Sequence, residues 1–231
     1  MKWLVIVLAA LLTLILIRLL YIAVSVPVFK KSWEHQAAQT PPASAVKIVA
    51  LGDSTVQGIG GLLPSNSFVG RIGNYAHHLT GRPVALYNFS LTGGKVSDVL
   101  NAQLAKARSI ANPDLILIAI GPNDLTGNTS LANYIKEYQQ VLEALPANKV
   151  VIATIPPIER RSISETNVQT WNEALRALAA QTHVSIADVH AQIYPRRNNP
   201  FLYGGDFFHP STYAYRFWAV AFEPAVKDIL Q

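Results

Sequence analysis

Two short segments near opposite ends of the chain carry residue types that together perform nucleophilic chemistry. Gly52-Asp53-Ser54 lies close to the start of the globular part, and Asp206-Phe207-Phe208-His209 lies close to the C-terminus. A serine hydroxyl is a weak nucleophile unless a base removes its proton, and a histidine base needs a third group that fixes its tautomer. Ser54, His209 and Asp206 are therefore the candidate nucleophile, base and orienting carboxylate.

Acyl transfer also needs hydrogen-bond donors directed at the oxygen that becomes negative in the tetrahedral intermediate. Three candidate donors are the backbone N–H of Ser54, the backbone N–H of Gly93 and the side-chain amide of Asn123. Gly93 has no side chain, so its N–H can come close to a substrate. Pro122 lacks an N–H, which costs nothing when the Asn123 side chain is the donor.

Other polar motifs offer competing interpretations. Asp188-x-His190 could supply a carboxylate and a base from one face of a strand end, although no helix start positions it. The glycine-rich run 58–61 fails the dinucleotide fingerprint because Leu63 occupies the third glycine position, so we interpret it as a wall beside the nucleophile. Asp53 and Asp124 are interpreted as structural residues of their loops.

Short β-branched segments alternate with longer segments whose apolar residues recur at helical spacing. The predicted strands are 46–51, 84–89, 114–120, 149–155 and 184–189. The predicted helices are 68–79, 96–110, 131–145, 165–181 and 213–229. Right-handed crossovers on such a chain predict a parallel sheet with helices on both faces, a three-layer α/β/α sandwich.

The candidate residues follow the ends of these strands. Ligands of open parallel sheets bind at the carboxyl ends of the strands. Ser54 follows the first predicted strand, Gly93 the second and Asn123 the third, and the segment with Asp206 and His209 follows the fifth. The sequence thus predicts that all of them lie on one rim of the sheet, with Pro210 and Ser211 opening the last helix.

The N-terminal segment from Trp3 to Phe29 is almost uninterrupted apolar sequence and is long enough to span a membrane, since about 20 residues suffice. Arg18 opposes a central position in the bilayer unless its long side chain reaches the interface. A cleaved signal peptide ending near Ala23-Val24-Ser25 is the alternative. We expect a membrane anchor or signal peptide over 1–29, a polar linker over 30–45 and a catalytic domain over 46–231.

The charge distribution argues against nucleic acid as a partner. The net charge is +5, and residues 1–44 carry +3 of it, namely four basic residues minus Glu34. The rest is near balance, and Arg160-Arg161 and Arg196-Arg197 are isolated pairs rather than a basic face.

From the apolar N-terminal segment, we expect a membrane-anchored protein with its catalytic domain outside the cytoplasm, or a secreted one if the segment is cleaved.

Cysteine is absent from the chain, which excludes disulfides, thiolate metal sites and a cysteine nucleophile. No His, Asp and Glu residues have metal-ligand spacing, because His77 and His78 are adjacent and the HExxH pattern is missing. The residues therefore offer no motif for a metal site.

Four blocks in this order resemble the conserved blocks of the SGNH (GDSL-type) esterase and lipase family. The blocks are Gly52-Asp53-Ser54-Thr55, Gly93, Gly121-Pro122-Asn123-Asp124 and Asp206-x-x-His209. Thr55 departs from the leucine of the usual signature. The resemblance covers 46–231 and implies a flavodoxin-like five-stranded sheet. The same resemblance implies a carboxylic ester hydrolase of lysophospholipase-like type that works without a metal or cofactor. It also implies the triad Ser54, Asp206, His209 and an oxyanion hole of Ser54, Gly93 and Asn123.

Three functions follow as hypotheses. The first is a serine esterase acting on small-molecule or lipid esters, or on acylated carbohydrates, through an acyl-enzyme. The second is an acyltransferase with a sugar or lipid hydroxyl as acceptor, and the third is a non-catalytic membrane-tethered binding module. Aromatic residues near the base could accept an acyl chain, and these are Tyr194, Phe201, Tyr203, Phe207 and Phe208.

Overall fold

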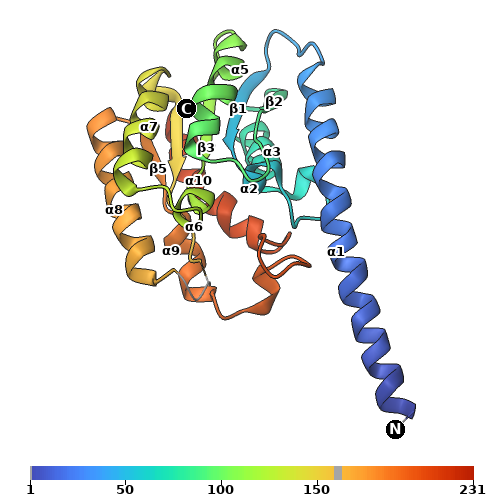
Figure 1. The fold of residues 1–231 in the computed structure, drawn as a ribbon. Coiled ribbons are helices and arrows are strands. Elements are labelled where there is room, and N and C mark those ends of the chain that lie inside the picture. Colours follow the sequence, from blue (N-terminus) through green and yellow to red (C-terminus); the bar gives the residue numbers. More distant parts are fainter. Residues whose placement is uncertain (1, 159–162) are drawn as a thin grey trace.

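In the computed structural model, which describes residues 2–158 and 163–231, a parallel sheet forms the centre of the domain (Figure 1). Its strands are β1 (Val46–Gly52), β2 (Val84–Asn88), β3 (Leu115–Ala119), β4 (Val150–Ala153) and β5 (Ser185–Ala187). Their spatial order is β2-β1-β3-β4-β5, and all pairs are parallel. This order confirms the predicted flavodoxin-like sheet. Arg160 and Arg161 lie outside the described residues.

Helices cover both faces of the sheet. The longer ones are α1 (Lys2–Ala37), α3 (Phe68–Thr80), α7 (Leu131–Glu143), α8 (Glu165–Thr182) and α10 (Ala214–Leu230). The shorter ones are α2 (Ser54–Gln57), α4 (Val96–Asp98), α5 (Leu104–Ser109), α6 (Pro122–Thr126) and α9 (Val189–Ile193). The three-layer sandwich predicted from the alternating pattern is confirmed.

The two faces of the sheet bury separate cores because successive side chains of a strand point to opposite sides. Ile48 and Ala50 of β1 join Phe68, Trp218 and Phe222 of α3 and α10 in one core. Val49 and Leu51 of the same strand join the other core, with aromatic residues of α7 and α8. From Ile48 to Leu51, β1 is thus apolar at every position, as a strand covered on both faces must be.

The segment 96–110, predicted as one helix, has an interruption. A π-helical turn over Val99–Gln103 separates α4 from α5. The wide turn ends at Gln103, whose buried amide bonds to both the N–H and the carbonyl oxygen of Gly52, at 2.8 Å each. Such turns occur often at functional sites, and this one lies directly behind the end of β1.

The expectation of a polar linker over 30–45 is wrong for residues 30–37, which continue helix α1. Ile22, Val26, Phe29 and Trp33 recur at helical spacing and form a stripe that packs on the α3 and α10 core. Trp33 is buried, and its indole N–H donates to the carbonyl oxygen of Gln57 at 2.9 Å. In residues 30–37 Trp33 is the one large apolar side chain among mostly polar residues, so the composition alone resembles that of a tether.

The other half of α1 makes no such packing. Residues 2–17 are exposed, and an 18-residue window of the helix with mean hydropathy 2.8 has none of its residues buried. Among the described residues, α1 is the one helix long and apolar enough to cross a membrane, although a signal sequence would pass the same test. Figure 1 shows this half extending past the domain.

The packing of α1 predicts the effect of Trp33→Ala. Removing a buried indole leaves a cavity and deletes the bond to Gln57, so we expect the free energy of unfolding to fall by about 3 kcal/mol. Denaturant unfolding of the full chain in detergent measures this. Ser32→Ala, at the exposed neighbouring position, is the control, and equal stabilities of the two variants would contradict the packing of α1.

Candidate active site

The turn that presents Ser54 depends on Gly52. Its backbone has φ +145°, and a Cβ there would lie 2.0 Å from the carbonyl oxygen of Ala119 on the neighbouring strand. Only glycine can therefore end β1 in this way. The Gln103 amide bonds to both the N–H and the carbonyl oxygen of Gly52. These two bonds fix the backbone where the chain enters the turn.

Asp53 is the N-cap of the short helix α2, and Ser54 is the first residue of that helix. One carboxylate oxygen of Asp53 accepts from the N–H and from the hydroxyl of Thr55, at 2.8 Å each. Burial raises the pKa of Asp53, and the two Thr55 bonds oppose this rise. The interpretation of Asp53 as a structural brace fits this geometry, because its oxygen is a helix cap.

His209 contacts both of its predicted partners. Its Nε2 lies 2.9 Å from the Ser54 hydroxyl, and its Nδ1 lies 2.5 Å from a carboxylate oxygen of Asp206. An ionised carboxylate only accepts hydrogen bonds, so Nδ1 carries the proton and Nε2 is free to accept one from Ser54. Two hydrogen bonds thus connect the Asp206 carboxylate to the Ser54 hydroxyl through the imidazole.

Asp206 is held by its own loop. The carboxylate oxygen that does not face the imidazole accepts from the backbone N–H groups of Phe208 and His209, at 3.0 Å each. Burial raises the pKa of Asp206, but the bonds from His209 and the histidine charge outweigh burial and hold this pKa at about 2. Asp206 is therefore ionised throughout the neutral range.

The loop that carries His209 is a narrow turn closed by backbone bonds. Tyr203 and Pro210 form an antiparallel bridge, and the N–H of Gly204 donates to the carbonyl oxygen of His209 at 2.7 Å. Regular helix begins only at Ala214, three residues after the predicted start at Pro210 and Ser211. Ser211 still caps this end, because its hydroxyl accepts from the N–H groups of Tyr213 and Ala214.

Gly60 lies directly against this loop. A Cβ at Gly60 would come within 2.4 Å of the carbonyl oxygen of Pro210 and 2.9 Å of the His209 Cβ, and its φ is +90°. The glycine-rich run is thus more than a wall beside the nucleophile. The histidine loop packs against it, and the absence of a side chain at Gly60 lets that loop approach Ser54.

Two of the three candidate oxyanion donors, Gly93 and Asn123, lie on neighbouring segments. The segment after β2 continues along β1, because Phe89 and Leu91 donate backbone bonds to Ala50 and Gly52. It carries Gly93, with φ +76°, toward the Ser54 turn. The amide of Asn123 donates to the carbonyl oxygen of Gly94 at 3.0 Å, which uses one of its two N–H groups.

Asp124 connects these two loops. Its side chain is buried, and one oxygen accepts from the N–H of Val96 at 3.0 Å. Burial raises the pKa of Asp124 to about 6, while the Val96 bond and the charge of Lys95 oppose the rise. The side chain therefore holds the loop with Gly93 against the helix that begins with Pro122 and Asn123.

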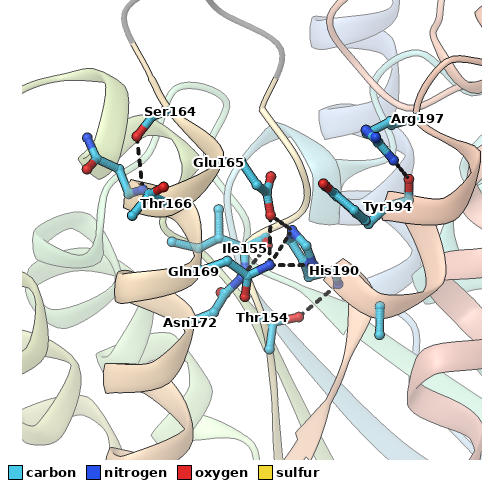
Figure 2. A network of polar contacts seen from close by, with 12 residues as sticks. Thr154, Ile155, Ser164, Glu165, Thr166, Gln169, Asn172, His190, Tyr194 and Arg197 are labelled. Atoms are coloured by element: carbon cyan, nitrogen blue, oxygen red, sulfur yellow. Dashed lines mark hydrogen bonds and ion pairs between the residues drawn. The ribbon is translucent and has the colours of Figure 1, made fainter.

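The rival pair Asp188 and His190 is engaged elsewhere, and Figure 2 shows the contacts of His190. His190 is buried, and its Nε2 lies 2.8 Å from a Glu165 oxygen. Asp188 pairs with Arg176 at 2.8 Å and accepts from the Thr154 hydroxyl at 3.1 Å. These contacts anchor the start of α8 and α9 to the end of β4, so the hypothesis that this pair supplies the base has no geometric support.

A cavity opens beside the Ser54 hydroxyl. Its lining includes Ser54, His209 and Asn123, together with apolar walls from Pro156, Pro157, Ile158, Ile193, Phe207, Phe208 and Trp218. Tyr203 also lines it, whereas Tyr194 and Phe201 do not. Tyr194 instead stacks on His190, with ring centroids 5.1 Å apart. Three of the five aromatic residues expected near an acyl chain thus reach the cavity.

Sequence reasoning missed the buried amides that hold the site. Gln103 binds the end of β1, and Asn172 binds the end of β4 through both polar backbone groups of Ile155, at 2.7 and 2.9 Å. Each lies inside a helix, where a lone amide carries no sequence signal. Among the described residues, no group of three or more His, Asp and Glu side chains could hold a metal ion.

A parallel α/β/α sandwich with serine, histidine and aspartate in contact at one rim is an arrangement suited to hydrolytic chemistry. The family model described as the GDSL-like lipase/acylhydrolase family matches residues 50–217. The chain therefore belongs to this family, as its four blocks indicated. No curated protein has a sequence significantly similar to it.

Solved structures share the fold. A protein named TesA is 19% identical with a TM-score of 0.68, covering 79% of this chain and 99% of that one. A lipase/acylhydrolase from Enterococcus faecalis is 21% identical with a TM-score of 0.65, covering 78% and 95%. An acetyl xylan esterase from Geobacillus stearothermophilus is 19% identical with a TM-score of 0.65, covering 79% and 95%. These similarities confirm the SGNH-type fold.

Asp124 predicts a pH dependence of stability. Between pH 4 and 6 the folded protein keeps a proton on Asp124 that the unfolded chain has lost, because the pKa is raised from 3.8 to about 6. Stability contributed by this group therefore falls as the pH rises through that window. The Asp124→Asn side chain does not titrate. Between pH 4 and pH 7 the free energy of unfolding of this variant should therefore rise by about 2 kcal/mol relative to that of the natural chain. Urea denaturation at both pH values measures this, and a constant difference would contradict it.

Proposed function

We propose that this protein is a serine esterase that hydrolyses carboxylic esters through an acyl-enzyme on Ser54. The observation that carries the proposal is the contact of His209 with both the Ser54 hydroxyl and Asp206, at 2.9 and 2.5 Å. The family to which the chain belongs is one of lipases and acylhydrolases, and the acetyl xylan esterase is one of its structural neighbours.

In the first half of the reaction, the Ser54 oxygen attacks the ester carbonyl carbon while His209 Nε2 takes the hydroxyl proton. The resulting tetrahedral intermediate collapses when the bond to the leaving oxygen breaks. His209 gives its proton to the departing alcohol, and the acyl group stays on Ser54. Asp206 stabilises the imidazolium that forms in between, and its low pKa keeps it ionised.

In the second half, water replaces the alcohol. His209 takes a proton from the water as its oxygen attacks the acyl carbon, and then returns a proton to Ser54 as the free acid leaves. The negative oxygen of both intermediates would be held by the N–H groups of Ser54 and Gly93 and by the second amide N–H of Asn123. Asp124 acts on this step indirectly, because it holds the segment with Gly93 against the helix that carries Asn123.

The cavity favours an ester with an apolar acyl group. Its apolar lining includes Pro156, Pro157 and Ile158 after β4, together with Phe207, Phe208 and Trp218. Burial of an acyl chain against such side chains is favourable, because it removes apolar surface from water.

We propose α1 as an uncleaved anchor, because removal of residues up to Ser25 would delete the contacts that Tyr21 makes with Gly61 and Leu62.

Ser54→Ala should abolish the activity. The alanine lacks the nucleophile but fits the turn, so hydrolysis of a chromogenic short-chain ester should fall by roughly a thousandfold or more with no change in unfolding. Labelling by a fluorophosphonate probe should also disappear. Ser65→Ala, at an exposed serine, is the control, and undiminished turnover by Ser54→Ala would refute the proposal.

Asp206→Asn tests the orienting role. The asparagine oxygen can still accept the two backbone N–H groups, but its amide cannot hold the Nδ1 proton of His209 in place. We expect kcat to fall roughly a hundredfold or more with little change in KM. Asp188→Asn, on the rival segment, should keep its turnover, and the reverse pattern would assign the base to His190.

A further inference from the structure

The rim around the cavity carries large apolar side chains that face solvent. Leu62, Leu63 and Phe201 are 64%, 57% and 75% exposed, and Phe207 is 65% exposed. They belong to one surface, because the N–H of Leu62 donates to the Thr212 hydroxyl and the neighbouring Ser211 hydroxyl donates to the carbonyl oxygen of Phe201. Clustered exposed apolar residues of this kind mark an interaction surface. We call these four residues the apolar rim.

Helix α1 leaves the domain at this same rim. The Tyr21 hydroxyl donates to the carbonyl oxygen of Leu62 at 2.6 Å. One turn earlier, Arg18 meets the histidine loop so closely that a Cβ on Gly205 would lie 2.6 Å from the Arg18 Cβ. Figure 1 shows the exposed half of α1 continuing past the end of the domain where the orange-to-red loops lie. The helix and the active site therefore face in the same direction.

The length of the free helix determines how far the rim stands from a bilayer. Residues 2–17 form about 24 Å of helix at about 1.5 Å per residue, whereas the hydrocarbon core is about 30 Å thick. The helix fills the core only if residues 18–21 lie at its boundary, and tilting makes the shortfall larger. Arg18 and Tyr21 are the residue types that occupy such a boundary. Their contacts with the domain bring the rim to the same depth.

Basic residues stand beside the apolar rim, as anionic headgroups require. The Arg71 guanidinium donates to the carbonyl oxygen of Thr212, next to the residues that hold Leu62 and Phe201. Arg216, one turn after Thr212, is exposed. Burial lowers the pKa of the Arg71 guanidinium, and the nearby charge of Arg216 lowers it further. Arginines around exposed leucine and phenylalanine are typical of a surface that enters the membrane interface.

We infer that the apolar rim rests on the bilayer that α1 enters, so that the mouth of the cavity opens onto lipid. This inference rests on the proposed function and specifies its substrate: an ester that resides in the membrane and reaches Ser54 with its acyl chain leading. Phe207 links the two surfaces, since it lines the cavity and is also part of the rim. The partner surface is a bilayer containing anionic lipid.

The depth of the rim can be measured directly because the chain has no cysteine. Leu63→Cys carries a single spin label on the rim, and Val220→Cys carries one on an exposed apolar position of α10. Each full chain is reconstituted into vesicles of phosphatidylglycerol and phosphatidylcholine. The label at position 63 should be several times more accessible to oxygen, relative to a water-soluble nickel chelate, than the label at 220. Equal accessibility at both positions would overturn the inference.

Activity gives the second test. The triple variant Leu62→Ser, Leu63→Ser, Phe201→Ser changes rim residues that do not line the cavity. It should hydrolyse a water-soluble short-chain ester at the natural rate but a long-chain ester embedded in the same vesicles about tenfold more slowly. Val220→Ser is the matched control and should match the natural chain on both substrates. An unchanged rate on the embedded ester would overturn the inference.

The two proposals fail in different ways. If the natural chain hydrolyses neither ester, the proposed function is wrong, and the delivery of substrate from the bilayer is wrong with it. The spin labels would still decide whether the rim lies on the membrane. If the natural chain hydrolyses the soluble ester and the label at position 63 reports water, the esterase stands and the membrane-facing rim is overturned.

Discussion

The hydrogen bond between His209 and Ser54 joins residues 155 positions apart, and the site exists only where two loops can come that close. Glycines at both surfaces permit the approach. Gly52 lets the end of β1 pass the neighbouring carbonyl oxygen, and Gly60 lets the histidine loop rest on the segment after the nucleophile. A side chain at either position would occupy space that backbone already fills, so the constraint on the site is steric.

Buried polar side chains complete what the glycines permit. Gln103, Asn172 and Asp124 each hold backbone groups at the carboxyl ends of strands or on the loops that follow them. A buried amide that satisfies both an N–H and a carbonyl oxygen determines the position of that backbone, because leaving either group unpaired is costly. The rim is therefore rigid where the proposed chemistry needs it, although its segments are loops or short helices.

Helix α1 gives the site a direction as well as a location. Its inner half belongs to the core through Phe29 and Trp33, and its outer half is apolar and exposed. Because one continuous helix carries both halves, the domain cannot rotate freely relative to whatever the outer half enters. The contacts of Arg18 and Tyr21 with the loops around the cavity make this coupling direct.

The sequence by itself determined the strand and helix pattern, the sandwich and the placement of Ser54, Asp206 and His209 after strand ends, because hydrophobic periodicity and short motifs are local signals. It could not reveal the π-helical turn at Gln103 or the role of Asp124, whose partners are remote in the chain. It also missed the packing of residues 30–37, since Trp33 is the one large apolar side chain in a stretch that otherwise looks polar. Only the tertiary structure decided which histidine meets Ser54, because that choice depends on which loop can physically reach the hydroxyl.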